Sequence, residues 1–217
     1  MIISTQQQKG GSGKTTLAIH LATGLALEGQ RVLMIDADPQ GSALDWASVR
    51  ERDSLFTVVG IPRPTINREV RALKQDYDSI VIDTPPRLAD VARASMMVSD
   101  LVVLPVQPSP YDCWSLADTI KLIRDAQAFN EALQAVIVIN RRIAKSAIGR
   151  DVIETLKEYD LPIAHACIGQ RVAFAESAGT GLTVLERDAR CKAAQEFAQL
   201  LKELKALVQG RPEGVSA

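Results

Sequence analysis

A glycine-rich segment near the start of the chain carries side chains suited to binding phosphate. Residues 8–16 read QKGGSGKTT and follow an apolar start, MII. Because glycine has no Cβ, the backbone here can turn successive N–H groups toward one anion at the start of a helix, where the helix dipole also favours negative charge. Lys14 can then reach the β- and γ-phosphates of a nucleotide, and the Thr15 hydroxyl is placed to bind Mg²⁺. The segment therefore predicts a phosphate-binding loop.

Two apolar segments that end in aspartate extend the predicted site. Residues 31–36 read RVLMID and residues 79–83 read SIVID, which is typical of strands buried on both faces. Asp38 follows the first strand in the stretch DADPQGS. Because ligands of open parallel sheets bind outside the carboxyl ends of the strands, Asp36 and Asp38 should face the same crevice as the loop. An apolar strand that ends in Asp83 is the form of a carboxylate placed beside Mg²⁺.

The loop departs from the common pattern GxxxxGK[ST] in two ways. Its first glycine is replaced by Gln8, and Lys9 adds a second lysine. The resulting KGGxGKTT is the deviant Walker A signature of the ParA/MinD family, which the chain resembles over about residues 1–208. The stretch DxDPQ at residues 36–40 matches the second signature of that family. In the family the extra lysine crosses a dimer interface, so the resemblance implies that Lys9 reaches the nucleotide of a partner in a homodimer that forms on ATP binding.

The resemblance also implies cofactors and residue roles. The cofactors are ATP and Mg²⁺, and the reaction is slow hydrolysis of ATP. Asp38 is implied to position the attacking water and the metal shell, Asp36 to support the site, and Asn140 to lie at the adenine. The implied catalytic residues are Lys9, Lys14 and Asp38. The implied nucleotide-binding residues are Lys9, Gly10, Gly11, Ser12, Gly13, Lys14, Thr15, Thr16 and Asn140, and the implied metal-binding residues are Thr15, Asp38 and Asp83.

Apolar segments and helical patterns alternate along the rest of the chain. Leucines at 17, 21 and 25 recur at helical spacing up to Gly29, and residues 1–36 form a strand, loop, helix and strand, which implies a parallel sheet. Further strands are predicted at 56–59, 79–83, 100–106, 135–140 and 161–168, and helices at 66–74, 87–97, 113–126 and 189–208. We predict a doubly wound, mostly parallel α/β sheet flanked by helices. It forms a single P-loop ATPase domain at residues 1–208, followed by a polar C-terminal tail at 209–217.

Composition limits the class of protein. A chain of 217 residues, 47% hydrophobic and 24% charged, is long enough to bury a substantial core in one domain. The formal net charge of −1 argues against a wholly basic protein that coats nucleic acid, but leaves room for a local basic patch. The three cysteines are widely spaced and odd in number, so they predict no disulfide framework and fit a reducing cytoplasm. Neither a signal peptide nor a membrane-spanning segment is predicted.

The most one-sided basic segment runs from 132 to 150, where no acidic residue occurs. It contains Arg142 and Lys145. Arg171 lies in a region that resembles the family's loop after its last strand, which holds nucleotide contacts and a DNA-contacting arginine. Because contacts from lysine and arginine to phosphates give affinity for DNA of any sequence, Arg142, Lys145 and Arg171 are our candidates for binding nonspecific DNA.

The resemblance implies a function in partition of a plasmid or chromosome. ATP would favour the dimer, and the dimer would double the basic surface, so that binding of nonspecific DNA depends on the nucleotide. A centromere-binding adaptor protein would stimulate hydrolysis, and the protein would be cytoplasmic and associated with the nucleoid. A related alternative is an ATPase that positions another cargo, such as a carboxysome-like or chemoreceptor assembly.

Two further alternatives differ in what the protein binds, a membrane in place of DNA, or in the reaction that it catalyses. A MinD-like protein would bind membrane through an amphipathic C-terminal helix, and Phe197, Leu200 and Leu204 belong to such a stripe. Here the lysines of that segment are matched by glutamates, which favours a helix docked on the protein's own core. A metabolic P-loop enzyme, such as a dethiobiotin-synthetase-like ligase, would need a small-molecule pocket. Lys9 and the DPQ stretch weigh against it.

Overall fold

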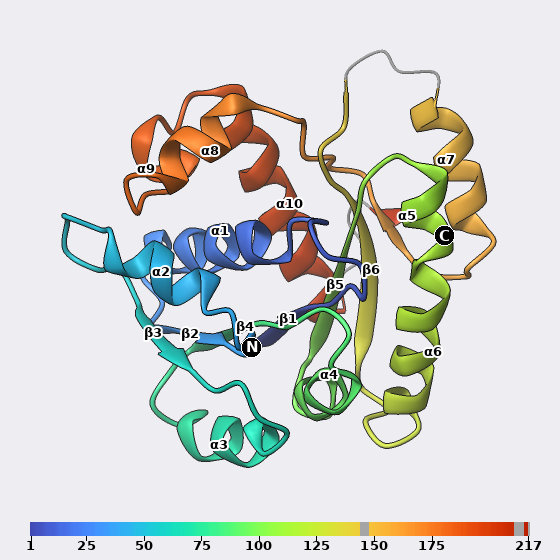
Figure 1. Cartoon of the computed structure of the whole chain (residues 1–217), viewed down its shortest axis with the longest axis horizontal. Coiled ribbons are helices and arrows are strands. Elements are labelled where there is room, and N and C mark those ends of the chain that lie inside the picture. Colours follow the sequence, from blue (N-terminus) through green and yellow to red (C-terminus); the bar gives the residue numbers. More distant parts are fainter. Residues whose placement is uncertain (144–147, 211–214, 217) are drawn as a thin grey trace.

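Strands from the whole chain form one twisted sheet (Figure 1). The computed structural model describes residues 1–143, 148–210 and 215–216. Within them the strand order is β3-β2-β4-β1-β5-β6-β7-β8, and all neighbours are parallel except β7 and β8. The strands are β1 (Ile2–Thr5), β2 (Val32–Asp36), β3 (Thr57–Gly60), β4 (Ser79–Asp83), β5 (Leu101–Val106), β6 (Gln134–Ile139), β7 (Ile163–Ala164) and β8 (Val215–Ser216). This confirms the predicted doubly wound, mostly parallel sheet.

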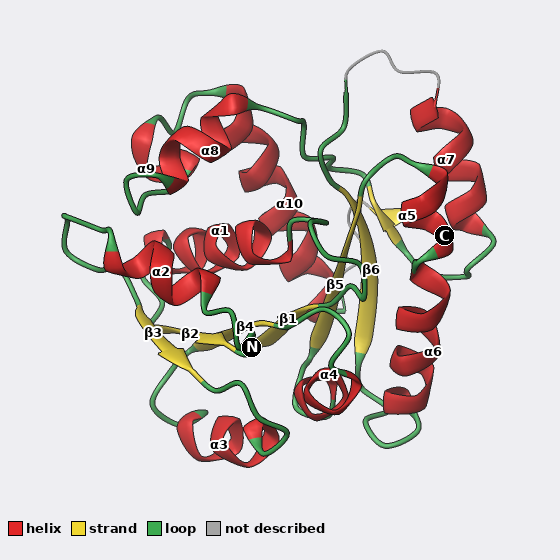
Figure 2. Ribbon diagram, in the orientation of Figure 1, coloured by secondary structure: helices red, strands yellow, loops and turns green. Residues whose placement is uncertain are grey.

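Helices cover both faces of the sheet (Figure 2). Helices α1, α2 and α10 pack on one face, and α3, α4, α6 and α7 pack on the other. The helices are α1 (Lys14–Leu27), α2 (Ser42–Ser48), α3 (Ile66–Leu73), α4 (Ala89–Met96), α5 (Pro110–Trp114), α6 (Leu116–Gln127), α7 (Ile148–Lys157), α8 (Val172–Ala178), α9 (Val184–Arg187) and α10 (Lys192–Val208).

Burial on both faces explains why the central strands are continuous apolar runs. Successive side chains of a strand point to opposite faces. In β1, Ile3 packs in the core with α1 and α10, whereas its neighbour Ile2 packs in the core with α3 and α4. In β4, Val81 and Ile82 divide between the same two cores. Ser4, the polar residue inside β1, is fully buried and accepts a hydrogen bond from the Ser99 hydroxyl at 3.0 Å.

The strand register brings the predicted acidic residues to one edge of the sheet. Asp36 at the end of β2 and Thr5 at the end of β1 are both register partners of Asp83 at the end of β4. The loop after β1 leads directly into α1. The carboxyl ends of three adjacent strands therefore lie beside the glycine-rich loop, as the sequence predicts.

The predicted helix at 113–126 is two helices that meet at Ser115. Helix α5 begins earlier, because Ser109 is its N-cap and accepts a hydrogen bond from the Asp112 N–H, and Pro110 is its first residue. The Ser115 hydroxyl donates to the Asp112 carbonyl at 2.7 Å, which satisfies a backbone acceptor at the end of α5.

The predicted strand at 161–168 is largely irregular, and only Ile163–Ala164 pair as β7. The Glu203 carboxylate of α10 accepts hydrogen bonds from the backbone N–H groups of His165 at 2.9 Å and Ala166 at 3.1 Å. These donors are therefore directed to a side chain and not to a neighbouring strand. The sequence predicted the apolar character of this segment but not the buried carboxylate that interrupts the pairing.

The C-terminal helix docks on the protein's own core. Its apolar stripe, Phe197, Leu200, Leu201 and Leu204, is buried against α1 and the sheet. Lys205 forms an ion pair with Glu28 at the end of α1 at 2.6 Å. This confirms the predicted docking. In the described part of the chain, no helix has the length and apolar character needed to cross a bilayer.

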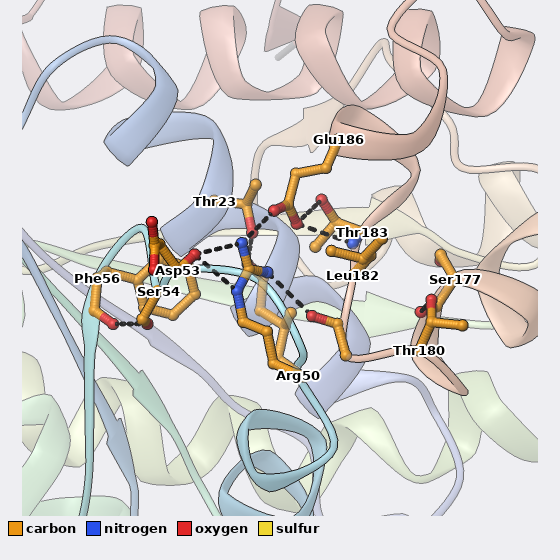
Figure 3. A network of polar contacts seen from close by, with 12 residues as sticks. Thr23, Arg50, Asp53, Ser54, Phe56, Ser177, Thr180, Leu182, Thr183 and Glu186 are labelled. Carbon is orange, nitrogen blue, oxygen red and sulfur yellow. Dashed lines mark hydrogen bonds and ion pairs between the residues drawn. The ribbon is translucent and has the colours of Figure 1, made fainter.

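A buried ion pair joins the segment after α2 to α9 (Figure 3). The Arg50 guanidinium donates to Glu186 at 2.6 Å, and the two side chains are 6% and 7% exposed. Arg50 also donates to the carbonyls of Asp53 and Gly181, at 3.0 Å and 2.9 Å. Burial would raise the pKa of Glu186, but hydrogen bonds from Arg50 and Thr183 hold it below its ordinary value. Both partners are therefore charged and satisfied.

We expect the Arg50→Met variant to be strongly destabilised, because it leaves the Glu186 carboxylate buried without its cation. The expected loss in the free energy of unfolding is about 3–5 kcal/mol. Urea denaturation followed by circular dichroism measures it. The matched control is Arg63→Met, because Arg63 pairs with Glu69 at 2.9 Å while 64% exposed, and its loss should stay below about 1 kcal/mol. Equal losses of unfolding free energy in the two variants would contradict the claim that burial makes the Arg50–Glu186 pair more important than the exposed one.

Candidate functional site

The glycine-rich loop between β1 and α1 has the backbone geometry of an anion site. Gly11 and Gly13 have φ values of 77° and 94°, in the left-handed region that favours glycine. Gly13 is the N-cap of α1, and no side chain caps the first turn of that helix. The N-terminal N–H groups of α1 are therefore available to a ligand. A cavity of about 410 Å³ lies over the loop and is lined by Gly10, Gly11, Gly13, Lys14, Thr15, Thr16 and Asp38, among others.

Lys14, Thr15 and Asp83 lie together beneath this cavity. Lys14 is buried, and burial lowers its pKa while the nearby carboxylates of Asp83 and Asp38 raise it. Burial is the main cause that raises the pKa of Asp83 to about 7, against the nearby Thr15 hydroxyl, which lowers it. One oxygen of Asp83 accepts from the Thr5 hydroxyl at 3.2 Å, and the other has no hydrogen-bond partner among the described residues.

These oxygen atoms fit a magnesium site. Mg²⁺ prefers oxygen ligands and is bound in nucleotide sites by one or two protein groups together with phosphates and waters. The unpartnered oxygen of Asp83, the Thr15 hydroxyl and the Asp38 carboxylate that faces the cavity supply such groups. A cation here would also favour the ionised form of Asp83. The residues present fit the metal site that the sequence predicts at Thr15, Asp38 and Asp83, and metal binding there stays a prediction.

Asp36 organises the loop that carries Asp38. One Asp36 oxygen accepts from the Asp38 N–H at 3.1 Å, and the other accepts from the N–H groups of Ala43 and Leu44 at 2.8 Å and 3.1 Å. These last two donors belong to the first turn of α2, so Asp36 satisfies the helix N-terminus from the sheet. Asp38 itself is half-buried and lines the cavity. The supporting role predicted for Asp36 has a structural basis in these bonds.

Lys9 is bound within its own chain. Its ammonium donates to Asp112 at 2.7 Å, and the Lys9 side chain is 39% exposed whereas that of Asp112 is 4% exposed. The same Asp112 oxygen accepts from the Ser109 hydroxyl at 2.6 Å. Sequence reasoning did not find Asp112. Its only local signal is the serine three residues earlier at the start of a short helix.

Two glutamines before the loop connect it to neighbouring elements. The Gln7 side-chain carbonyl accepts from the Lys9 N–H at 3.4 Å and from the Thr119 hydroxyl of α6 at 3.3 Å. The Gln6 side-chain carbonyl accepts from the Thr84 hydroxyl at 2.9 Å, directly after β4. Both glutamines are buried. They anchor the start of the loop to α6 and to the end of β4, which sequence patterning did not reveal.

Two side-chain amides support the middle of the loop. Asn140, after β6, donates through Nδ2 to the Ser12 carbonyl at 2.8 Å and accepts through Oδ1 from the Arg141 N–H at 2.9 Å. Gln107, after β5, donates through Nε2 to the Gly11 carbonyl at 2.8 Å. Asn140 therefore lies at the phosphate-binding loop. Gln107 was not among the predicted site residues.

A second cavity, of about 770 Å³, lies beside the first. Gly13 and Thr16 line both cavities, and Asn140, Arg141, Arg142, Arg171 and Phe174 line the second. The Arg142 side chain is exposed. Arg171 donates to Glu196 at 2.6 Å and 3.1 Å, so its charge is matched within the chain. Lys145 lies outside the described residues.

Comparison with known proteins identifies the family. Residues 3–184 match the family model described as the CobQ/CobB/MinD/ParA nucleotide binding domain. The chain belongs to this family. It is therefore a P-loop nucleotide-binding protein of the ATPase class, in agreement with the resemblance found in the sequence.

Individual relatives in this family carry different names. The chain is 32% identical to the maintenance of carboxysome distribution protein A of Halothiobacillus neapolitanus, over 90% of this chain and 92% of that protein. It is 29% identical to the sporulation initiation inhibitor protein Soj of Bacillus subtilis, over 94% and 98% of the two chains. It shares its fold with the cobyrinic acid a,c-diamide synthase of Mycobacterium smegmatis, solved with an ATP analogue and magnesium, at a TM-score of 0.81 and 20% identity, over 98% and 97%.

His20 attaches the helix of the phosphate-binding loop to the α8–α9 segment. Its Nδ1 donates to the Thr16 carbonyl at 2.7 Å, and its Nε2 accepts from the Val184 N–H at 3.3 Å. The ring lies between Phe174 and Phe197, with centroids at 5.1 Å from each. Burial is the main cause that lowers the pKa of His20 from its ordinary 6.5 to about 4. Both nitrogens of the neutral ring are hydrogen-bonded. A second proton, on Nε2, would remove the acceptor of the Val184 N–H.

We expect the His20 contribution to destabilise the folded protein as the pH falls from 6.5 toward 4, whereas the raised pKa of Asp83 contributes with the opposite sign. In that window the unfolded chain binds a proton at His20 that the folded protein excludes, so unfolding is favoured by up to about 3 kcal/mol. Urea denaturation of wild type and His20→Gln across pH 4.5–7.5 isolates this contribution, because Asp83 is common to both: relative to its stability at pH 7.5, wild type should lose more stability than His20→Gln as the pH falls. The assignment would be contradicted if His20→Gln and wild type had the same dependence.

Proposed function

We propose that this protein is an ATP-dependent dimerising ATPase that partitions DNA. The observation that carries the proposal is the position of Lys9. It lies in the phosphate-binding loop, yet its ammonium pairs with the buried carboxylate of Asp112, and the Lys9 side chain stays 39% exposed. A lysine that only neutralised the nucleotide of its own chain would duplicate Lys14, which is already buried beside Asp83. In this proposal Lys9 exchanges its bond to Asp112 for the nucleotide of a second copy.

The residues of the site support hydrolysis of ATP. Phosphoryl transfer to water requires charge neutralisation and an in-line water rather than covalent chemistry from the protein. Lys14 and the N–H groups of the loop bind the phosphates, and Thr15, Asp38 and Asp83 hold Mg²⁺, which neutralises charge on the phosphate oxygens. Asp38 also orients the attacking water, and Lys9 of the partner subunit adds a second cation.

DNA binding follows from dimerisation in this proposal. Two protomers present twice the basic surface, and multivalency makes the affinity for nonspecific DNA depend on ATP. Among the described candidates, Arg142 is exposed, whereas Arg171 already pairs with Glu196. Arg142 is therefore the stronger candidate for a phosphate contact, with Lys145 nearby in sequence. A centromere-binding adaptor protein stimulates hydrolysis, and the protein is cytoplasmic and associated with the nucleoid.

A second candidate function is positioning of a protein cargo. The observation that favours it is the 32% identity to a carboxysome distribution protein over nearly the full length of both chains. The switch would be the same, and only the adaptor would differ. Membrane binding through α10 has less support, because the apolar stripe of that helix is buried in the core.

We expect ATP, and not ADP, to drive a dimer that captures DNA. Sedimentation velocity with Mg²⁺ and either nucleotide measures the dimer, and nonspecific DNA at low salt measures capture. The ATP state should bind DNA on the order of tenfold or more tighter than the ADP state. Lys9→Ala should abolish both effects.

The matched control is Lys74→Ala, since Lys74 is an exposed lysine at the end of α3 and far from the loop in sequence. It should leave dimerisation and DNA capture unchanged. If the dimer forms but ATP leaves the affinity for DNA unchanged, the proposed DNA binding is wrong. Positioning of a protein cargo then becomes the better-supported function. A protein that stays monomeric with ATP would contradict the role of Lys9.

A further inference from the structure

A buried carboxylate holds Lys9 within its own chain. Asp112 lies in α5, and its side chain is 4% exposed. One of its oxygens accepts from the Lys9 ammonium at 2.7 Å and from the Ser109 hydroxyl at 2.6 Å, and the other has no hydrogen-bond partner in the described part of the chain. Among the described residues, no other lysine or arginine forms an ion pair with Asp112. The charge of this carboxylate is therefore balanced by Lys9.

The two partners of this bond differ in their access to water. The Lys9 side chain is 39% exposed, so its ammonium can turn toward another anion. The Asp112 carboxylate stays in place, because the Ser115 hydroxyl donates to the Asp112 carbonyl at 2.7 Å and the Tyr159 hydroxyl donates to the Cys113 carbonyl at 2.9 Å. Removal of one partner of a buried ion pair costs more free energy than the pair itself contributes, since the remaining charge is neither solvated nor balanced. Departure of Lys9 is therefore opposed by Asp112.

The backbone of Lys9 is held separately from its side chain. Its N–H donates to the Gln7 side-chain carbonyl at 3.4 Å, and the same carbonyl accepts from the Thr119 hydroxyl of α6 at 3.3 Å. These bonds do not involve Asp112. The ammonium of Lys9 can therefore change its partner by rotation of the side chain, while the start of the phosphate-binding loop stays attached to α6.

We propose that Asp112 is an autoinhibitory residue, which opposes dimerisation by holding the Lys9 ammonium until the nucleotide of a second copy competes for it. This rests on the proposed function, because it takes that nucleotide as the competing anion. ATP carries more negative charge than ADP and attracts the ammonium more strongly. Asp112 therefore sets a threshold that ATP passes more readily than ADP, and loss of its charge lowers the threshold.

Asp112→Asn tests the inhibition, because asparagine has nearly the same volume and can still accept from the Ser109 hydroxyl but carries no charge. Sedimentation velocity over a series of protein concentrations, with Mg²⁺ and ATP, measures the dissociation constant of the dimer. We expect this constant to be roughly tenfold lower in Asp112→Asn than in wild type. The double variant Lys9→Ala, Asp112→Asn should stay monomeric, as Lys9→Ala does, because it has no ammonium to release.

The matched control is Asp78→Asn, which changes the net charge of the protein by the same amount. Asp78 pairs with Arg31 at 3.0 Å while 46% exposed, and it directly precedes β4, at the opposite end of that strand from Asp83. Asp78→Asn should leave the dissociation constant of the dimer at its wild-type value. An equal gain in both variants would mean that net charge, and not release of Lys9, strengthens the dimer.

Urea denaturation of the nucleotide-free protein gives a readout that needs no ATP, dimer or DNA. Lys9→Ala should lower the urea midpoint, because it leaves the buried Asp112 carboxylate without its cation. Addition of Asp112→Asn to Lys9→Ala should raise the midpoint again, since no charge is then left unbalanced. The four proteins form a double-mutant cycle that measures the bond between the two side chains directly.

Two results would overturn the inference. One is a wild-type dimer whose dissociation constant Asp112→Asn leaves unchanged or raises, and this result would leave the proposed function intact. The other is an equal urea midpoint for Lys9→Ala and the double variant, whatever the nucleotide does. If wild type stays monomeric with ATP, a dimer of Asp112→Asn supports the inhibition, whereas no dimer in either protein contradicts the proposed function and the inference together. Asp112→Leu, which replaces the carboxylate by an apolar side chain, takes the place of Asp112→Asn if that variant does not fold.

Discussion

The site depends on a loop whose backbone is held in a conformation that few sequences adopt. Gly11 and Gly13 take left-handed φ values, and the loop then presents N–H groups to an anion at the start of α1. The surrounding contacts serve this geometry. Glutamines hold the start of the loop, amides from the ends of β5 and β6 hold its middle, and His20 ties the following helix to α9. The parallel sheet matters to function because it brings all these strand ends to one edge.

Much of the fold and part of the site could be predicted from the sequence. Strands that are buried on both faces must be apolar along their whole length, so β2, β4 and β5 are visible as continuous runs. The loop pattern and the rule that parallel sheets bind ligands at their carboxyl ends then place Asp36, Asp38 and Asp83 together. The structure confirms this arrangement.

The contacts between distant segments could not be predicted. Glu203 ends β7 early by accepting two backbone bonds, yet in the sequence it is one glutamate among others on an amphipathic helix. Helix α9 is four residues long and begins with a capping box formed by Thr183 and Glu186. Glu186 also pairs with Arg50, which is 136 residues earlier in the sequence. Asp112 and Gln107 are polar residues in a proline-rich turn, and only the fold shows that they contact the loop. The spacing of apolar residues shows which face of a helix or strand is buried. It does not show which residue a polar side chain will bind.

The central claim is that Lys9 acts on the nucleotide of a second copy, and a mixing experiment tests it most directly. Lys9→Ala and Asp38→Ala proteins are assayed for ATP hydrolysis separately and then together. Each should be inactive alone. In a mixed dimer, the site of the Lys9→Ala chain keeps its own Asp38 and receives Lys9 from the partner subunit, so the account predicts that mixing restores hydrolysis. If Lys9 acts within its own chain, every site in the mixture lacks one residue, and a mixture that stays inactive while forming dimers would contradict the account.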